Sequence, residues 1–239
     1  MSGWRVLFIS AAMAALVFGT GAVSADEAAA PVARGRAGAG VTLDFARDWR
    51  IVAPSNDRVA RTAAAEAALV LERITRKRLP FAAREEAGAP AVVLSHGPRG
   101  DGFNWRATAT RVEIKGDGPR GLLYGVYDFL ESLGCRWVEP GIRGERLPSG
   151  TSLYPSRAFS RQAPSFQGRC LILGHAAFLA DGENWIVWAA RNRLNTIFIH
   201  VIGDALAFGA APEKQWLKIR DTVLESMRDR GMVIEYGGH

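Results

Sequence analysis

The pattern of hydrophobic and polar positions predicts alternating strands and helices along most of this chain. A short apolar run at 49–54 predicts the first strand, and apolar residues then recur at helical spacing as far as Arg78. Asn56 or Asp57 can cap this helix, because either side chain accepts hydrogen bonds from the first backbone N–H groups. The helix should bury its apolar face, which consists of Val59, Ala63, Ala67, Val70 and Ile74.

Four strands and a second helix are predicted next. The apolar run at 91–95 predicts a buried strand, and two alternating runs in "FNWRATATRVEIKG" can pair as a hairpin across Ala109 and Thr110. The helix begins near Pro119, a residue that fits the first helical turn, and Gly134 can take the left-handed conformation after its end. A short strand, "CRWVEP", follows directly.

The second helix is amphipathic. Its apolar face consists of Leu122, Leu123, Val126, Phe129, Leu130 and Leu133. Its other face carries Tyr124, Tyr127, Asp128 and Glu131, which we interpret as a partly solvated surface rather than as catalytic residues. The order β-α-β-β-β-α-β over residues 41–155 predicts an α+β domain, a small sheet with two helices on one face.

Residues 157–239 follow a different pattern, in which single strands alternate with single helices. Strands are predicted at 166–173, 194–201 and 232–236, and helices at 182–193 and 212–230. The strands are apolar on both faces, which is typical of a parallel sheet. A closed (β/α)8 barrel needs eight such units, so we expect the first βα units of an incomplete, truncated TIM-type barrel. A doubly wound sheet is the alternative, but no glycine-rich phosphate loop follows any strand.

The chain opens with a separate hydrophobic segment. Arg5 precedes the apolar run "VLFISAAMAALVF" and small residues end at Ala25, so residues 1–25 are predicted to be a secretory signal peptide. A membrane anchor would need about 20 apolar residues, whereas "GTG" breaks this run. Residues 26–40 form a linker rich in Gly, Ala and Arg. We expect a periplasmic or secreted protein that starts at Asp26 and has no membrane span.

Composition argues against several partners. The 239 residues carry a formal net charge of +6, but the basic residues are scattered among acids, so no nucleic-acid partner is expected. Cys135 and Cys170 are the only cysteines; they either form a disulfide or lie separately as small hydrophobic residues. No histidine lies at ligand spacing from either cysteine, so we expect neither a metal nor another cofactor. The oligomeric state stays open.

The segment "RGLLYGVYDFLESLGCRW" carries a family resemblance. It resembles the non-catalytic N-terminal domain that precedes the barrel in bacterial β-N-acetylhexosaminidases of glycoside hydrolase family 20 and in α-glucuronidases. Residues 41–239 as a whole are most similar to exported bacterial proteins that combine this domain with a glycosidase-like barrel. The resemblance implies a hexosaminidase/α-glucuronidase-like α+β domain at 41–155, followed at 157–239 by the start of such a barrel.

The second block resembles the opening of the family-20 barrel. In "PSFQGRCLIL", Arg169 falls on a family arginine that binds sugar hydroxyls, although Cys170 replaces the glycine that follows it. The segment "LNTIFIHVIGD" resembles the motif Leu-Asn-x-x-His-x-His-x-x-Asp-Asp, and it departs from that motif at Phe198 and Gly203. The residues of the motif that it retains are Leu194, Asn195, His200 and Asp204. The resemblance implies that Arg169, His200 and Asp204 bind substrate.

The last residues, "EYGGH", resemble a family motif Asp-x-x-x-His, with Glu235 and His239 at its two ends. In that family the pair supports a catalytic glutamate two strands later, and this chain contains no counterpart of that glutamate. The resemblance therefore implies that this chain carries no catalytic residue. It also implies that the chain is the N-terminal portion of an exported glycoside hydrolase and that this portion is inactive by itself. A non-catalytic carbohydrate-binding or interaction module is the alternative, and the sequence does not identify the sugar.

The individual residues also have simpler interpretations. Arg169 could pair with a carboxylate at the start of its strand, and His200 could be a buried, hydrogen-bonded histidine. Asp204 could cap or turn a loop. Asp204 and Glu235 are also a conceivable catalytic pair, since glycosidases need two carboxyl groups that flank the scissile bond. We expect the catalytic pair to lie downstream.

Overall fold

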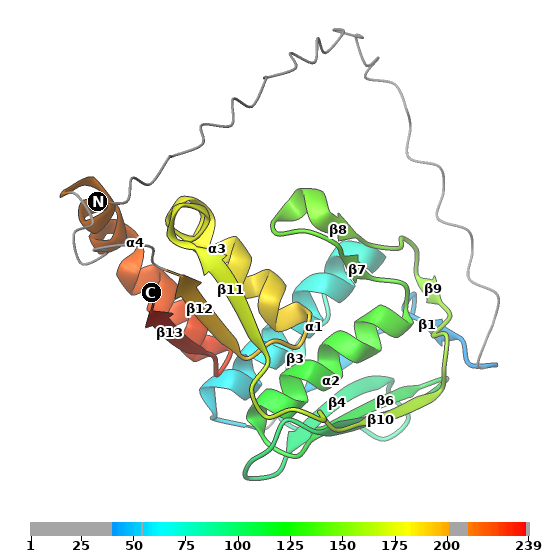
Figure 1. The fold of residues 1–239 in the computed structure, drawn as a ribbon. Helices are drawn as coiled ribbons and strands as arrows, with labels where there is room; N and C mark the ends of the chain where they lie inside the picture. The colour runs from blue at the N-terminus through cyan, green and yellow to red at the C-terminus, as the bar shows by residue number, and fades with distance from the viewer. Residues whose placement is uncertain (1–39, 54, 201–209, 238–239) are drawn as a thin grey trace, which may run out of the picture. The chain divides into compact units, whose positions relative to one another are not determined.

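The computed structural model describes residues 40–53, 55–200 and 210–237, and all of them belong to one compact unit. Figure 1 shows its helices and strands. None of the helices in these ranges is long and apolar enough to cross a membrane.

A six-stranded sheet lies on one side, in the order β10-β5-β6-β4-β2-β3. The hairpin β5–β6 pairs Thr108 with Arg111, which confirms the predicted turn at Ala109 and Thr110. The strands β3, β2, β4 and β6 run parallel to one another, while β5 pairs antiparallel with both β6 and β10. The bounds are β2 (Arg50–Val52), β3 (Phe81–Ala82), β4 (Ala91–His96), β5 (Phe103–Thr108), β6 (Arg111–Gly116) and β10 (Phe159–Gln162).

The strand β10 was not predicted, and it joins two parts of the chain. Residues beyond 155 return to the first sheet, where Phe159 pairs with Arg106 and Gln162 pairs with Phe103. The sheet of the first block therefore includes four residues that lie after position 155 in the sequence.

Two helices cover one face of this sheet, α1 (Arg58–Thr75) and α2 (Pro119–Ser132). Asp57 caps α1, because its carboxylate accepts hydrogen bonds from the backbone N–H groups of Val59 and Ala60 at 2.8 and 3.1 Å. The helix ends before Arg78, since Arg76 adopts the left-handed conformation with a φ of 60°. Pro119 opens α2 as predicted.

The polar face of α2 is buried, so its interpretation as a partly solvated surface was wrong. Tyr124, Tyr127 and Asp128 are each at most 2% exposed, and only the Glu131 side chain keeps 24% exposure. Part of the cover comes from positions 157–239, because Tyr124 donates to the backbone oxygen of Leu194 and Asp128 accepts from Arg193. Trp137 packs against Tyr127. Gly121 permits the close approach at the start of the helix, since a Cβ there would overlap the carbonyl oxygen of Gly102.

The second half of the chain forms a three-stranded parallel sheet in the order β11-β12-β13. Helices alternate with its strands, as the sequence predicts. The predicted helix at 182–193 begins earlier, because α3 continues through a kink at Asp181. Gly231 ends the last helix with a φ of +62°. The bounds are β11 (Cys170–Gly174), α3 (His175–Arg191), β12 (Thr196–His200), α4 (Ala210–Asp229) and β13 (Val233–Gly237).

Two small sheets complete the described structure. One pairs β1 (Leu43–Asp44) with β9 (Ser152–Leu153), and the other pairs β7 (Arg136–Trp137) with β8 (Glu145–Arg146), the latter pair joined by a 3-10 turn (Ile142–Gly144). β7 is much shorter than the strand that "CRWVEP" predicted. The two cysteines are not bonded to each other; Cys135 is buried and Cys170 is exposed.

The helices lie between the two main sheets. α1 and α2 contact the six-stranded sheet and also contact α4 and α3, respectively, while α3 and α4 contact the three-stranded sheet. The order is therefore six-stranded sheet, α1 and α2, α3 and α4, three-stranded sheet (Figure 1).

Ion pairs link the two halves across this helix layer. Asp128, on α2, accepts hydrogen bonds from Trp105 and Arg157, each at 2.7 Å, and from Arg193 at 3.1 Å. Burial alone would raise the pKa of the Asp128 carboxyl, but the hydrogen bonds from Arg157 and Trp105 outweigh it and hold this pKa below its ordinary value. Further pairs between the two halves are Glu131–Arg193, Glu66–Arg191, Glu66–Arg230, Glu145–Arg191, Asp101–Arg169, Arg58–Glu225 and Arg58–Asp229.

Replacing Asp128 with Asn should destabilise the protein by about 2–3 kcal/mol. The substitution leaves Arg157 without its carboxylate partner and places an amide N–H group among hydrogen-bond donors. Urea unfolding followed by tryptophan fluorescence measures the difference. Asp48→Asn is the matched control, because the Asp48 side chain is 99% exposed and its loss should change the free energy of unfolding by less than about 0.5 kcal/mol. Equal effects of the two substitutions would contradict this role of Asp128.

Candidate functional site

The carboxyl ends of β11, β12 and β13 meet at one edge of the three-stranded sheet. In its register Gly174 pairs with His200, and His200 pairs with Gly237. The backbone of His200 therefore lies at the carboxyl edge, as the sequence predicts. Its side chain is outside the described part of the structure. Asp204 and His239 lie outside the described residues altogether.

Glu235 lies near the same edge, on the neighbouring strand. It pairs with Phe198, two residues before His200 on β12. The Glu235 side chain is exposed, and none of the described residues donates a hydrogen bond to it. The structure thus brings the backbone of His200 close to Glu235.

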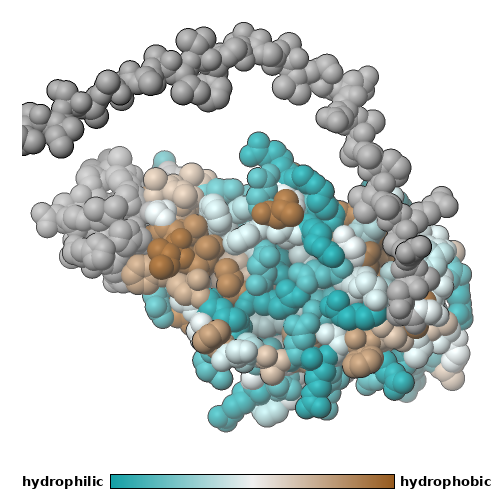
Figure 2. Space-filling view, turned by 45° about the vertical axis from the view of Figure 1, so that its right-hand side comes forward, coloured by the Kyte–Doolittle hydropathy of each residue, from teal (hydrophilic) through white to brown (hydrophobic). Residues whose placement is uncertain are grey.

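One face of the three-stranded sheet is open. Ile172 is 66% exposed and Val233 is 51% exposed, and both share a face with Glu235 and Cys170, because cross-strand partners and every second residue lie on one side. Partial burial raises the pKa of the Cys170 thiol; a backbone hydrogen bond at Phe198 opposes this change, and the Glu235 carboxylate adds to it. Figure 2 shows hydrophobic residues gathered at the left of the view, the side that carries this sheet. The opposite face is covered by α3 and α4.

Arg169 lies at the other end of β11. Its side chain is 16% exposed, and its guanidinium donates to Asp101 Oδ2 at 2.6 Å and to the backbone oxygens of Arg193 and Phe166 at 2.7 and 2.8 Å. It also lies 5.3 Å from the centre of the Tyr124 ring. The strand between Arg169 and the carboxyl edge extends about 13 Å, so the structure separates Arg169 from His200 and Glu235.

Asp101 is the carboxylate that holds this arginine, and sequence reasoning missed it. Its side chain is 7% exposed and also accepts from Arg120 Nε at 2.7 Å. Burial alone would raise the pKa of Asp101, but the hydrogen bonds from Arg120 and Arg169 outweigh it and lower this pKa. Asn195 completes the cluster, because its Oδ1 accepts from the Arg169 backbone N–H at 2.9 Å. The only sequence signal was the short acidic insertion within the glycine-rich loop "GPRGDG".

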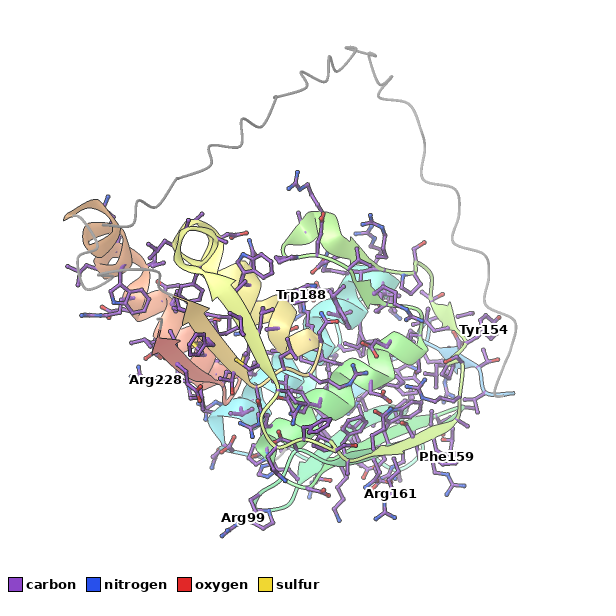
Figure 3. All side chains as sticks on the ribbon, viewed as in Figure 1. Arg99, Tyr154, Phe159, Arg161, Trp188 and Arg228 are labelled. Carbon is purple, nitrogen blue, oxygen red and sulfur yellow. The ribbon has the colours of Figure 1, made fainter. Side chains whose placement is uncertain are left out.

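A separate shallow pocket of about 230 Å³ lies between α3 and the β7–β8 loop. Trp188, labelled in Figure 3, lines it together with Asn184. Of its charged lining groups, Glu145 pairs with both Arg191 and Arg73, and Glu139 is exposed. We therefore assign no chemistry to this pocket. Among the residues that the structure describes, no three His, Cys, Asp or Glu side chains lie close enough together to hold a metal ion.

The fold is similar to parts of several solved glycoside hydrolases. A GH115 4-O-methyl-α-glucuronidase with specificity for decorated arabinogalactans is 12% identical at a TM-score of 0.62, over 82% of this chain and 29% of that one. A GH138 enzyme targeting pectin rhamnogalacturonan II is 12% identical at a TM-score of 0.54, over 80% and 24%. A mutant Streptomyces plicatus β-hexosaminidase, in complex with its product GlcNAc, is 19% identical at a TM-score of 0.56, over 83% and 42%.

This chain has the fold of one segment of a glycoside hydrolase. The predicted resemblance is confirmed at the level of the fold, and the chain spans between 24 and 42% of the length of these three structures. No family model matches the sequence, and neither does any curated protein.

Replacing Arg169 with Ala should lower the free energy of unfolding by about 2–4 kcal/mol, because it leaves the buried Asp101 with one charged partner and removes the contacts at the start of β11. Chemical denaturation monitored by circular dichroism provides the measurement. Arg228→Ala serves as the control, since the Arg228 side chain is 60% exposed on α4 and its removal should cost less than about 0.5 kcal/mol. An Arg169→Ala protein as stable as this control would favour a role in ligand binding instead.

Proposed function

We propose that this chain is the N-terminal portion of an exported, carbohydrate-active glycoside hydrolase, in which residues 157–239 supply the first βα units of a (β/α)8 barrel. The open face of the three-stranded sheet carries the proposal. In such a barrel the helices form the outer ring and the inner faces of the strands bury one another's side chains. Ile172 and Val233 are more than half exposed on the face opposite to α3 and α4, and neighbouring barrel strands would cover them.

The substrate site of this proposal lies at the carboxyl ends of the strands, where barrel enzymes build their active sites. His200 and Asp204 would bind sugar hydroxyls, and Glu235 and His239 would support a catalytic residue from a later strand. The contacts of Arg169 favour the alternative interpretation of this residue, an ion pair at the start of its strand.

Glycosidic hydrolysis sets a requirement that the described residues do not meet. One carboxylic acid must protonate the leaving oxygen while a second group stabilises the developing positive charge on the sugar. Glu235 is the only carboxylate on the open face within the described strands. Asp204 is its conceivable partner, but the family resemblance assigns both catalytic groups to later strands. We therefore propose that this portion is inactive by itself.

This chain should show no turnover of chromogenic N-acetylhexosaminides or glucuronides above that of its Glu235→Gln variant. A chain extended through the complete barrel should hydrolyse at least one glycoside. Release of the chromophore, followed by absorbance, measures both. If the 239-residue chain itself turns over such a substrate and either Asp204→Asn or Glu235→Gln abolishes the activity, the catalytic pair lies here and the proposal is wrong.

Export is the second part of the proposal, and it places the protein in the periplasm or outside the cell. Arg5, the apolar run that follows it and the small residues that end at Ala25 support it. Mass spectrometry of the intact protein from a bacterial expression host should give a chain that begins at Asp26. Retention of residues 1–25 in the extracytoplasmic fraction, or a protein confined to the cytoplasm, would contradict it.

A non-catalytic carbohydrate-binding module is the second candidate function. The exposed outer face of the six-stranded sheet favours it, because that face lies opposite to the helices α1 and α2 and away from the three-stranded sheet.

A further inference from the structure

The six-stranded sheet buries one face against α1 and α2 and exposes the other. On β5, Phe103, Trp105 and Ala107 are buried, while the residues between them are exposed. The register aligns two rows of exposed side chains across three strands. One row consists of Arg161, Asn104 and Lys115, and the other of Phe159, Arg106 and Glu113.

This surface, the β10–β5–β6 face, carries an excess of positive charge. Arg106, Lys115 and Arg161 are exposed, and no described residue forms an ion pair with any of them. Figure 3 shows Arg161 and Phe159 directed away from the helix layer. These three cations therefore form no ion pair with a described residue, although Glu113 is the cross-strand partner of Arg106.

The acidic groups nearby are largely committed to other partners. Glu113 and Glu85 pair with Arg111, and Glu86 pairs with Arg50. Asp117, an exposed residue, follows the end of β6 in a loop and lies beyond both rows. Arg111 is shared between Glu85 and Glu113, so it does not fully neutralise either carboxylate. The two rows still carry an excess of positive charge, because three cations stand against the single carboxylate of Glu113.

The geometry points to a non-catalytic binding surface for an acidic polysaccharide on the β10–β5–β6 face. Neighbouring strands lie about 4.8 Å apart and alternate residues along a strand about 6.8 Å apart, so the two rows cover an area on the order of 10 by 7 Å. This area suits a short stretch of a uronic-acid chain. The charge of the surface by itself indicates an anionic partner. That this partner is a polysaccharide rests on the proposed function.

Each side chain has a chemical role on this surface. The guanidinium groups of Arg106 and Arg161 can each bind a uronate carboxylate with two parallel hydrogen bonds, and Lys115 adds a third cation. The Asn104 amide can donate to and accept from hydroxyl groups. Phe159, which is 68% exposed, offers a ring face for the apolar side of a pyranose.

The test compares two triple variants of the full chain with equal changes in net charge. In the first, Arg106→Gln, Lys115→Gln and Arg161→Gln remove the cations of the surface. In the second, the exposed residues Arg47, Lys218 and Arg143, which lie outside this sheet, are each replaced by Gln. Binding to immobilised polygalacturonate is measured by biolayer interferometry, with the fully methyl-esterified polymer as the uncharged control.

We expect the surface variant to bind polygalacturonate about tenfold more weakly, since three exposed charge contacts are lost, and the control variant to change by less than about twofold. Phe159→Ala should weaken binding by about threefold. Neither the unmodified chain nor any of these variants should bind the esterified polymer. Added salt should weaken the binding of polygalacturonate, because exposed charges are screened.

Several outcomes would overturn the inference. Equal losses in both triple variants would show that only net charge matters. If the unmodified chain does not bind polygalacturonate, or binds the esterified polymer equally tightly, the β10–β5–β6 face is not a binding surface for an acidic polysaccharide. Tighter binding to vesicles of anionic phospholipid or to DNA, lost in the surface variant, would assign the surface to another partner. None of these results bears on whether the extended chain hydrolyses a glycoside. Failure of the polysaccharide-binding inference can therefore be distinguished from failure of the proposed hydrolase function.

Discussion

Carboxylates on the first half of the chain neutralise arginines on the second half, and the arrangement of both halves depends on this contact. The carboxylates are Glu66, Asp101, Asp128, Glu131 and Glu145, and their arginine partners are Arg157, Arg169, Arg191, Arg193 and Arg230. A buried charge that loses its partner costs several kcal/mol. Three of these arginines also lie over aromatic rings of the first half, at 5.3 to 5.6 Å from the ring centres. The two halves therefore have a specific docking geometry rather than only an apolar contact.

This docking determines which end of the three-stranded sheet remains available for chemistry. Arg169 and Asn195 precede their strands and bind Asp101, so the amino edge of the sheet is fixed against α2 and the adjoining loop. The carboxyl edge, with Gly174, His200 and Gly237, carries no such contact among the described residues. The residues that match family motifs thus lie at two edges. Arg169 and Asn195 hold the structure together at the amino edge, and His200 is a candidate substrate-binding residue at the carboxyl edge.

The elements that sequence patterns predicted correctly are those determined by local interactions. Helical spacing predicted both helices of the first block, Asp57 was found as a cap, and alternation predicted the β5–β6 hairpin. The burial of the polar face of α2 was missed. Asp128 pairs with Arg157 and Arg193, 29 and 65 positions away, and the local spacing of apolar residues gives no information about such distant contacts. β10 was missed for a similar reason: its four residues are mostly polar and become a strand only by pairing with β5. At the site, resemblance located His200 and Glu235 on neighbouring strands, whereas the role of Arg169 depended on Asp101, which no motif indicated.

Hydrogen exchange on the intact chain tests most directly whether the two halves form one cooperative unit. Glu66 lies on α1 and pairs with Arg191 and Arg230 of the second half. In the unmodified protein, peptides from α2 and β12 should open with the same free energy, and in Glu66→Gln both should lose protection together. If β12 exchanges at a much lower free energy than α2 and is unchanged by Glu66→Gln, the buried ion pairs do not hold the two halves together and the account is wrong.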